Sequence, residues 1–127
     1  MTKKPITYLD LDDLAAIARK VVGPGVQVRD HGLLASALAR AEATVFGTEP
    51  YPDLFTKAGA LMHSLIKNHA YVDGNKRVGL VAGLLFLAMN GVHLTGSDDE
   101  LFDLTMAIAG GDLDDVDKIA DRLRALQ

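Results

Sequence analysis

Apolar residues recur along this chain at the spacing of an α-helix, and no segment alternates in the manner of a β-strand. Six helices are predicted, and most begin beside an Asp or Ser that can cap a helix. The predicted helices run from a cap at Asp10 or Asp12 through Val22, from Asp30 to about Phe46, from Asp53 toward His69, from about Asn75 to Met89, from Ser97 or Asp98 to Ala109, and from a start within 112–115 to near Leu126. Gly and Pro at 23–25 and 47–52 cannot continue a helix, and 90–91 is a typical helix end. We expect 92–95 to be a short extended piece, and the whole to be an all-α, compact bundle of about six helices.

The fourth predicted helix contains the longest apolar run of the chain, 78–89. A bilayer span needs about 20 such residues, so no membrane partner is expected. The run instead favours a central helix that is buried on nearly every side. Gly79 and Gly83, one turn apart within it, would let a neighbouring helix approach closely.

Composition limits the classes of protein to be considered. A chain of 127 residues predicts one domain over 1–127 with a real hydrophobic core. The net charge of −4 argues against direct nucleic acid binding, because phosphate backbones select basic faces. The absence of cysteine excludes disulfides and cysteine metal sites and fits a cytoplasmic protein. Lys3 and Lys4 are not followed by the apolar stretch of a signal peptide, so none is expected.

The segment 69–77, His-Ala-Tyr-Val-Asp-Gly-Asn-Lys-Arg, gathers an imidazole, a carboxylate, a glycine, an amide and two cations. Lys76 and Arg77 fall at the start of the fourth predicted helix, where the helix dipole opposes each cation by about 0.3–1 kcal/mol. Free N–H groups at the same place form a ready anion site. The cations are therefore explained if a phosphate chain binds among them. The alternative is a polar loop with solvated charges.

Two side chains of this segment could take part in chemistry or merely end a helix. His69 is the candidate general base, because imidazole titrates near neutral pH and can accept the proton of a hydroxyl. It could instead bond the last carbonyls of the third predicted helix. Asp73 could hold Mg²⁺, which carboxylates and phosphate oxygens bind together, or it could cap the fourth predicted helix.

The remaining residues of the segment suit a phosphorylated ligand. Gly74 permits a tight turn and a close approach of the backbone to a ligand. Asn75 brings an amide that can cap a helix or bind phosphate. Lys76 offers a compact charge and Arg77 a two-pronged guanidinium, and both suit phosphate oxygens. Lys76 could alternatively be solvated.

Other polar groups are interpreted as structural. His31, His63 and His93 lack ligand spacing such as His-x-x-x-His, so no zinc site is predicted. Acidic residues within 98–100 and 112–117 fall at the starts of the last two predicted helices, where carboxylates cap and complement the dipole.

The segment resembles the signature of the Fic/Doc family, written His-x-Phe-x-Asp-Gly-Asn-Gly-Arg-x-x-Arg in the Fic branch. The matching positions are His69, Tyr71 for the aromatic, Asp73, Gly74, Asn75 and Arg77. Lys76 replaces the second glycine and Leu80 the second arginine, which is the pattern of the Doc branch, the death-on-curing toxins of bacterial toxin–antitoxin pairs. Segments 30–38 and 51–55 also look like those of such toxins, so the resemblance extends over about 9–92.

The resemblance implies a Fic-like fold with its active-site loop between the third and fourth helices, and ATP and Mg²⁺ as cofactors. It assigns Mg²⁺ to Asp73. Because Lys76 partly fills the anion hole and the second arginine is missing, ATP would bind reversed, with its γ-phosphate near His69. The implied activity is phosphorylation of a protein hydroxyl, with a threonine of elongation factor Tu as target and arrested translation as result.

Two alternatives stay open at this point. One is AMP transfer to a protein hydroxyl, as in the Fic branch. The other is an inert binding module that acts only through its antitoxin complex. The chain lacks the Ser/Thr-x-x-x-Glu-Gly/Asn helix of self-inhibited Fic proteins, so the resemblance implies a cognate antitoxin that is partly disordered and folds on binding.

Overall fold

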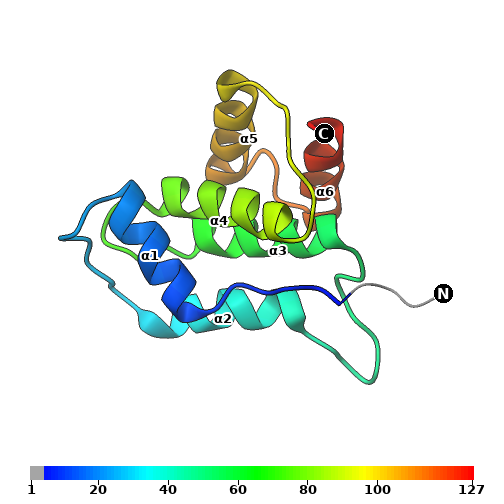
Figure 1. Cartoon of the computed structure of the whole chain (residues 1–127), viewed down its shortest axis with the longest axis horizontal. Helices are drawn as coiled ribbons and strands as arrows, with labels where there is room; N and C mark the ends of the chain where they lie inside the picture. Colours follow the sequence, from blue (N-terminus) through cyan, green and yellow to red (C-terminus); the bar gives the residue numbers. More distant parts are fainter. Residues whose placement is uncertain (1–4) are drawn as a thin grey trace.

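The computed structural model describes residues 5–127, in which six α-helices are joined by loops (Figure 1). The helices are α1 Leu11–Val21, α2 His31–Glu42, α3 Leu54–Lys67, α4 Asn75–Met89, α5 Asp98–Gly110 and α6 Val116–Ala125. The predicted all-α class is thereby confirmed. Within this part of the chain the only β-type pairings are two isolated bridges, Val28 with Tyr71 and Val45 with Thr48. Lys3 and Lys4 lie outside the described residues.

Side-chain caps explain where most helices begin. In five of the six, an oxygen of the preceding residue accepts a hydrogen bond from a backbone N–H of the first turn. These caps are Asp10 for α1, Asp30 for α2, Asp53 for α3, Ser97 for α5 and Asp115 for α6. Each such cap stabilises its helix by about 1 kcal/mol, because it satisfies a donor that the helix leaves free. The start of α4 has no such side-chain cap, and it forms part of the candidate site described below.

The second helix is shorter than predicted. The prediction that the second helix reached Phe46 is wrong, because α2 ends at Glu42 and Ala43 leaves the helical region with ψ 141°. The chain then forms a tight turn in which Val45 and Thr48 exchange backbone hydrogen bonds of 2.7 and 3.0 Å. Segment 92–95 forms neither helix nor strand.

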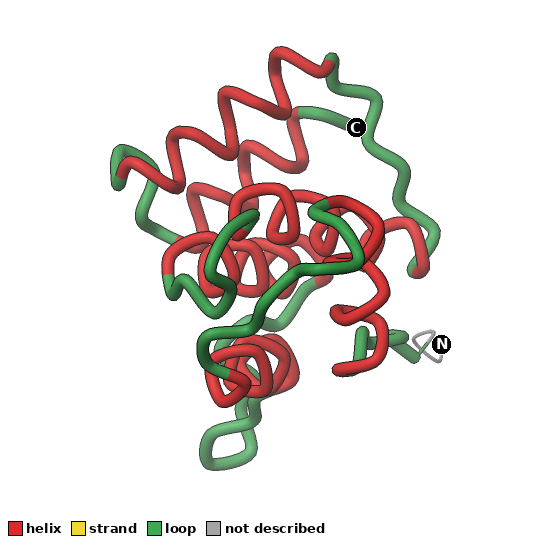
Figure 2. Tube along the Cα trace, turned by 90° about the vertical axis from the view of Figure 1, so that its left-hand side faces the viewer, coloured by secondary structure: helices red, strands yellow, loops and turns green. Residues whose placement is uncertain are grey.

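α3 is the central helix of the molecule. It packs against α2, α4, α5 and α6, and ten of its fourteen residues are buried. α5 and α6 lie on one side of the α3–α4 pair and α2 lies on the other (Figure 2). The expectation that α4 would be buried on nearly every side is corrected: Leu85 and Met89 of α4 are 37% and 39% exposed.

The two glycines of α4 bring it against α3, as predicted. A Cβ at Gly79 would lie 2.5 Å from Cγ1 of Ile66, and one at Gly83 would lie 2.5 Å from Sδ of Met62. No side chain fits between the helices at these points. The close packing places the end of α3, and with it His69, beside the start of α4. No helix among residues 5–127 is long and apolar enough to cross a bilayer.

Candidate active site

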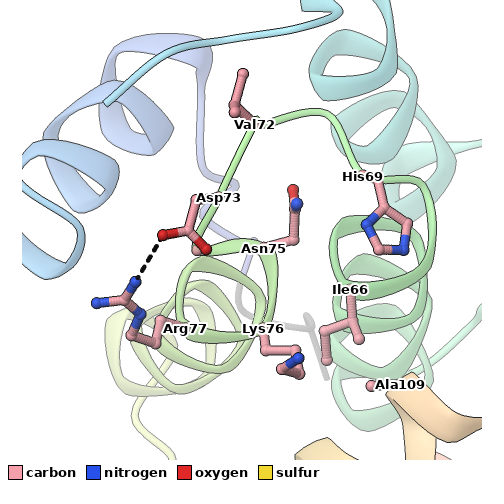
Figure 3. A pocket seen from close by; sticks show the side chains of 9 residues that line it. Ile66, His69, Val72, Asp73, Asn75, Lys76, Arg77 and Ala109 are labelled. Carbon is pink, nitrogen blue, oxygen red and sulfur yellow. Dashed lines mark ion pairs between the residues drawn. The ribbon is translucent and has the colours of Figure 1, made fainter. Parts of the chain in front are cut away.

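The structure brings all the predicted site residues to one pocket of about 450 Å³ (Figure 3). Its lining combines the polar residues of the motif with three apolar neighbours. The polar part is His69, Asp73, Gly74, Asn75, Lys76 and Arg77, and the apolar part is Ile66, Val72 and Ala109. The pocket lies where the end of α3, the following loop and the start of α4 meet, and Ala109 of α5 closes one side.

α4 begins without any side-chain cap. Its first intrahelical bond joins the N–H of Val78 to the carbonyl of Gly74 at 2.9 Å. The three N–H groups before Val78 therefore have no partner within the helix. Asp73 does not cap α4, so the alternative that this aspartate serves as a helix cap is wrong. Unsatisfied N–H groups and the positive end of the helix dipole make the pocket attractive to an anion.

Gly74 is required by both conformation and space. Its φ of +88° is in the left-handed region, which glycine adopts without strain. A Cβ at this position would also lie 2.2 Å from Cγ2 of Val22, the residue directly after α1. The loop thus turns into α4 while it packs directly on the end of α1.

Asn75 uses its side chain to close the loop. The amide is buried; its Oδ1 accepts from the N–H of Tyr71 at 3.0 Å and its Nδ2 donates to the carbonyl of Tyr71 at 2.9 Å. Both ends of the amide are satisfied by the backbone. The side chain therefore positions the loop, and the group that Asn75 leaves for a ligand is its backbone N–H.

Tyr71 anchors the loop in the core. Its side chain is 2% exposed, and its hydroxyl has no hydrogen-bond partner among the described residues. Burial raises the pKa of this phenol, so it stays neutral. The aromatic position of the motif serves packing rather than chemistry.

His69 is exposed and holds an unusual backbone conformation. Its φ is +53°, in the left-handed position that follows many helices and is usually taken by Gly or Asn. For a histidine this conformation costs about 1–3 kcal/mol unless neighbours hold it in place. Figure 3 shows the imidazole at the end of α3, across the pocket from Asp73 and Arg77.

Arg29 holds the backbone of His69 in this conformation. This residue was not identified from the sequence. Its Nε donates to the carbonyl of His69 at 2.9 Å; its Nη2 donates to the same carbonyl and to that of Asn68 at 3.4 Å. The backbone N–H groups of Arg29 and Asp30 both donate to the carbonyl of Ala70, at 2.7 and 3.0 Å. The segment before α2 thus fixes the backbone on both sides of His69.

The charges of the pocket are only loosely paired. Nη2 of Arg77 lies 3.6 Å from Oδ2 of Asp73, whose side chain is 84% exposed. Nη1 of Arg77 also donates to the carbonyl of Val21 at 3.1 Å, which ties α4 to α1. An exposed pair of this kind contributes little to stability. Asp73 is therefore accessible to a metal ion and Arg77 to a phosphate.

The donor set suits Mg²⁺ that arrives with a nucleotide. Among residues 5–127, no three or more His, Cys, Asp or Glu side chains are grouped so that they could hold a metal ion by themselves. Mg²⁺ in nucleotide sites is held by one or two carboxylates together with phosphate oxygens and water. Asp73 offers one accessible carboxylate at the edge of the anion site, which fits this mode of binding.

His63 has a structural place. Its Nδ1 lies 2.9 Å from Nη1 of Arg40, and its Nε2 lies 2.8 Å from Oδ1 of Asp114. The hydrogen bond from His63 lowers the pKa of the Asp114 carboxyl. These contacts join α2, α3 and the turn before α6, away from the pocket. His31 and His93 are exposed.

Comparisons with known proteins point to one family. A family model described as the Fic/DOC family matches residues 8–87, which include Arg29 and the whole motif. "Toxin Doc" of Mycolicibacterium smegmatis is 45% identical over 118 residues, covering 91% of this chain and 90% of the relative. "Protein kinase doc" of Escherichia phage P1 is 37% identical over 103 residues, covering 81% of this chain and 78% of the relative.

Proposed function

Because the chain belongs to the Fic/DOC family, we propose that it is the toxin of a toxin–antitoxin pair and transfers the γ-phosphoryl group of ATP to a protein hydroxyl. Two relatives named as a Doc toxin and as a Doc protein kinase support both parts of this proposal. The observation that carries it is the uncapped start of α4, which meets His69, Asp73 and two cations in one pocket.

In the proposed reaction His69 is the catalytic base. Its imidazole takes the proton of the target hydroxyl, whose oxygen then attacks the γ-phosphorus. The bond from the γ-phosphorus to the oxygen that bridges it to the β-phosphate breaks, and ADP leaves with that oxygen. The imidazole returns the proton to solvent. Phosphoryl transfer of this kind depends mainly on positioning and on the stabilisation of charge.

The phosphate oxygens are held by the start of α4. The free N–H groups of Asn75, Lys76 and Arg77, with the two cationic side chains, face the developing negative charge. Gly74 allows the phosphates to approach this backbone. Asp73 would hold Mg²⁺, which when bound neutralises phosphate charge. Asn75 and Arg29 act as positioning residues, because each is hydrogen-bonded to the loop backbone.

The choice of phosphoryl transfer over AMP transfer rests on Lys76 and Leu80. Lys76 adds a side chain where the Fic pattern has its second glycine, which reduces the room for a nucleotide bound in the Fic direction. Leu80, one turn along α4, is apolar and half-buried, so it supplies no second cation for distal phosphates. A reversed ATP with its γ-phosphate at His69 fits both residues.

We further infer the biological setting. The target is a threonine of elongation factor Tu, whose modification arrests translation in the cytoplasm. A cognate antitoxin, partly disordered when free, restrains the enzyme by folding onto it. A mainly apolar groove on the described surface runs between α1 and α2, and a groove of this kind suits an amphipathic helix.

Labelled ATP tests the proposal. The chain is incubated with Mg²⁺, elongation factor Tu and ATP that carries the label at either the γ- or the α-phosphate. Label from the γ-position on the target is the expected result, with none after His69→Ala. Label from the α-position would establish AMP transfer instead. If neither label reaches the target although the chain still binds its antitoxin, the chain is an inert binding module instead of a transferase.

A further inference from the structure

A second cavity of about 350 Å³ lies between α4 and α5 and adjoins the active-site pocket, since Lys76 and Arg77 line both. We call it the α4–α5 groove. Beyond the two cations its lining is mainly apolar: Leu80, Asp98, Leu101, Phe102, Thr105 and Met106. The groove therefore has a cationic end at the active site and an apolar end away from it.

The apolar end exposes side chains that a helix normally buries. Phe102 is 62% and Met106 is 42% exposed, although both are large and hydrophobic. They lie one turn apart on α5 and face Leu80 across the groove. A flat aromatic ring with a thioether beside it is a favourable surface for an aromatic base, through stacking and sulfur–aromatic contact.

We propose that the α4–α5 groove holds the adenosine end of the nucleotide, with the base against Phe102 and Met106. This inference rests on the proposed function, which places the γ-phosphate at the start of α4. The remaining phosphates then need cations along their path, and Lys76 and Arg77 stand between the two cavities. The carboxylate of Asp98 in the same lining can accept hydrogen bonds from ribose hydroxyls.

In this arrangement Leu80 determines which part of the nucleotide the groove favours. An arginine at this position would project a charge into the groove beside Phe102 and favour phosphate there. A leucine keeps the groove apolar and favours a nucleoside. The residue that departs from the Fic pattern thus selects which end of the nucleotide lies in the groove.

Binding and steady-state measurements on the full chain test the proposal. Phe102→Ala should raise the Kd and KM for ATP about 10-fold with little change in kcat, because base–aromatic stacking is lost while the phosphate site is intact. Phe102→Trp should restore binding. Inorganic tripolyphosphate, which has no nucleoside, should bind Phe102→Ala and the unaltered protein equally. Phe46→Ala is the matched control, since Phe46 is also exposed but lies in the turn after α2.

The outcomes separate this inference from the proposed function. If the unaltered protein transfers γ-phosphate but Phe102→Ala and Phe46→Ala bind ATP equally well, the groove is not the nucleoside site, while the proposed phosphotransferase activity is supported. If the protein binds ATP tightly and Phe102→Ala weakens it while no phosphate reaches a target, the groove is the nucleoside site and the proposed activity falls. Transfer of AMP would place the adenosine end at His69 and overturn the inference.

Discussion

His69 shows how the chain places a reactive side chain at the expense of local backbone stability. Its left-handed conformation would be strained in isolation, and Arg29 compensates by donating to the carbonyls around it. A catalytic group fixed in this way needs little reorganisation when substrate binds. In the proposed reaction, this fixed backbone would hold the imidazole in place to act as the base.

Replacing His69 by Ala, or Asp73 by Asn, should abolish activity with the fold intact. We expect phosphoryl transfer to fall by about 100- to 10,000-fold for His69→Ala, because general base catalysis contributes that much. Both side chains are exposed, so the free energy of unfolding should change by less than about 0.5 kcal/mol. Single-turnover rates and thermal denaturation measure the two effects. A well-folded His69→Ala protein that still arrests growth would rule out the base.

Lys76 should decide which phosphate is transferred. Lys76→Gly enlarges the anion hole toward the Fic pattern, but Leu80 still withholds the second arginine. We expect weakened phosphorylation together with some AMP transfer, measured as the ratio of γ- to α-label on the target. Unchanged γ-phosphate transfer by this variant would show that the lysine is not the discriminator.

The residue types of the site could be predicted from the sequence, but not all of their roles. The motif gave His69, Asp73 and Arg77 at the pocket. It did not reveal that the Asn75 amide is hydrogen-bonded to the backbone of Tyr71, because the neighbouring sequence does not show whether an asparagine side chain is buried or exposed. Arg29 was missed because its partners lie about 40 positions away along the chain and its own segment is too short to show periodicity.

At the level of helices, capping chemistry made the starts predictable. Asp10, Asp30, Asp53 and Ser97 bind the first-turn N–H groups as their residue types suggest. The ends of the helices and their burial were harder to predict. α2 ends at Glu42, but the first Gly or Pro after it in the sequence is Gly47. α3 is more enclosed than α4 because four helices pack on it, which is a property of the assembly and not of its own sequence.

Gly79→Ala tests the contact that joins α3 to α4. The added Cβ would lie 2.5 Å from Cγ1 of Ile66, a stiff β-branched residue buried at the pocket wall. We expect a loss of about 1–3 kcal/mol in the free energy of unfolding, typical of overpacking, and a lower rate of transfer. Chemical denaturation measures the first and labelled ATP the second.

Gly110→Ala is the control for that change. It is also a helical glycine, but a Cβ there would meet nothing within 4 Å. Its free energy of unfolding should stay within about 1 kcal/mol of the unaltered protein. Equal destabilisation by the two substitutions would show that the close approach of α3 and α4 has no special importance.

At the scale of the whole molecule, we expect the activity to be controlled by a second protein. The active-site pocket is open, and the described helices include none that carries the inhibitory pattern. Binding of an antitoxin encoded beside this gene should stabilise the folded state by about 2.7 kcal/mol at 100 times its Kd, which corresponds to roughly 10 °C in Tm. Calorimetry of the free and bound toxin measures this shift. An unchanged Tm at saturating antitoxin would contradict folding of the antitoxin onto the toxin.

The intact mass of elongation factor Tu, purified from cells that express this chain without its antitoxin, tests whether the chain is a phosphotransferase toxin. We expect arrested growth and a gain of one phosphoryl group, both lost when His69→Ala is expressed at the same level. A gain of AMP would contradict phosphoryl transfer. Arrested growth with unmodified elongation factor Tu would contradict the target, and unaffected growth would contradict the toxin itself.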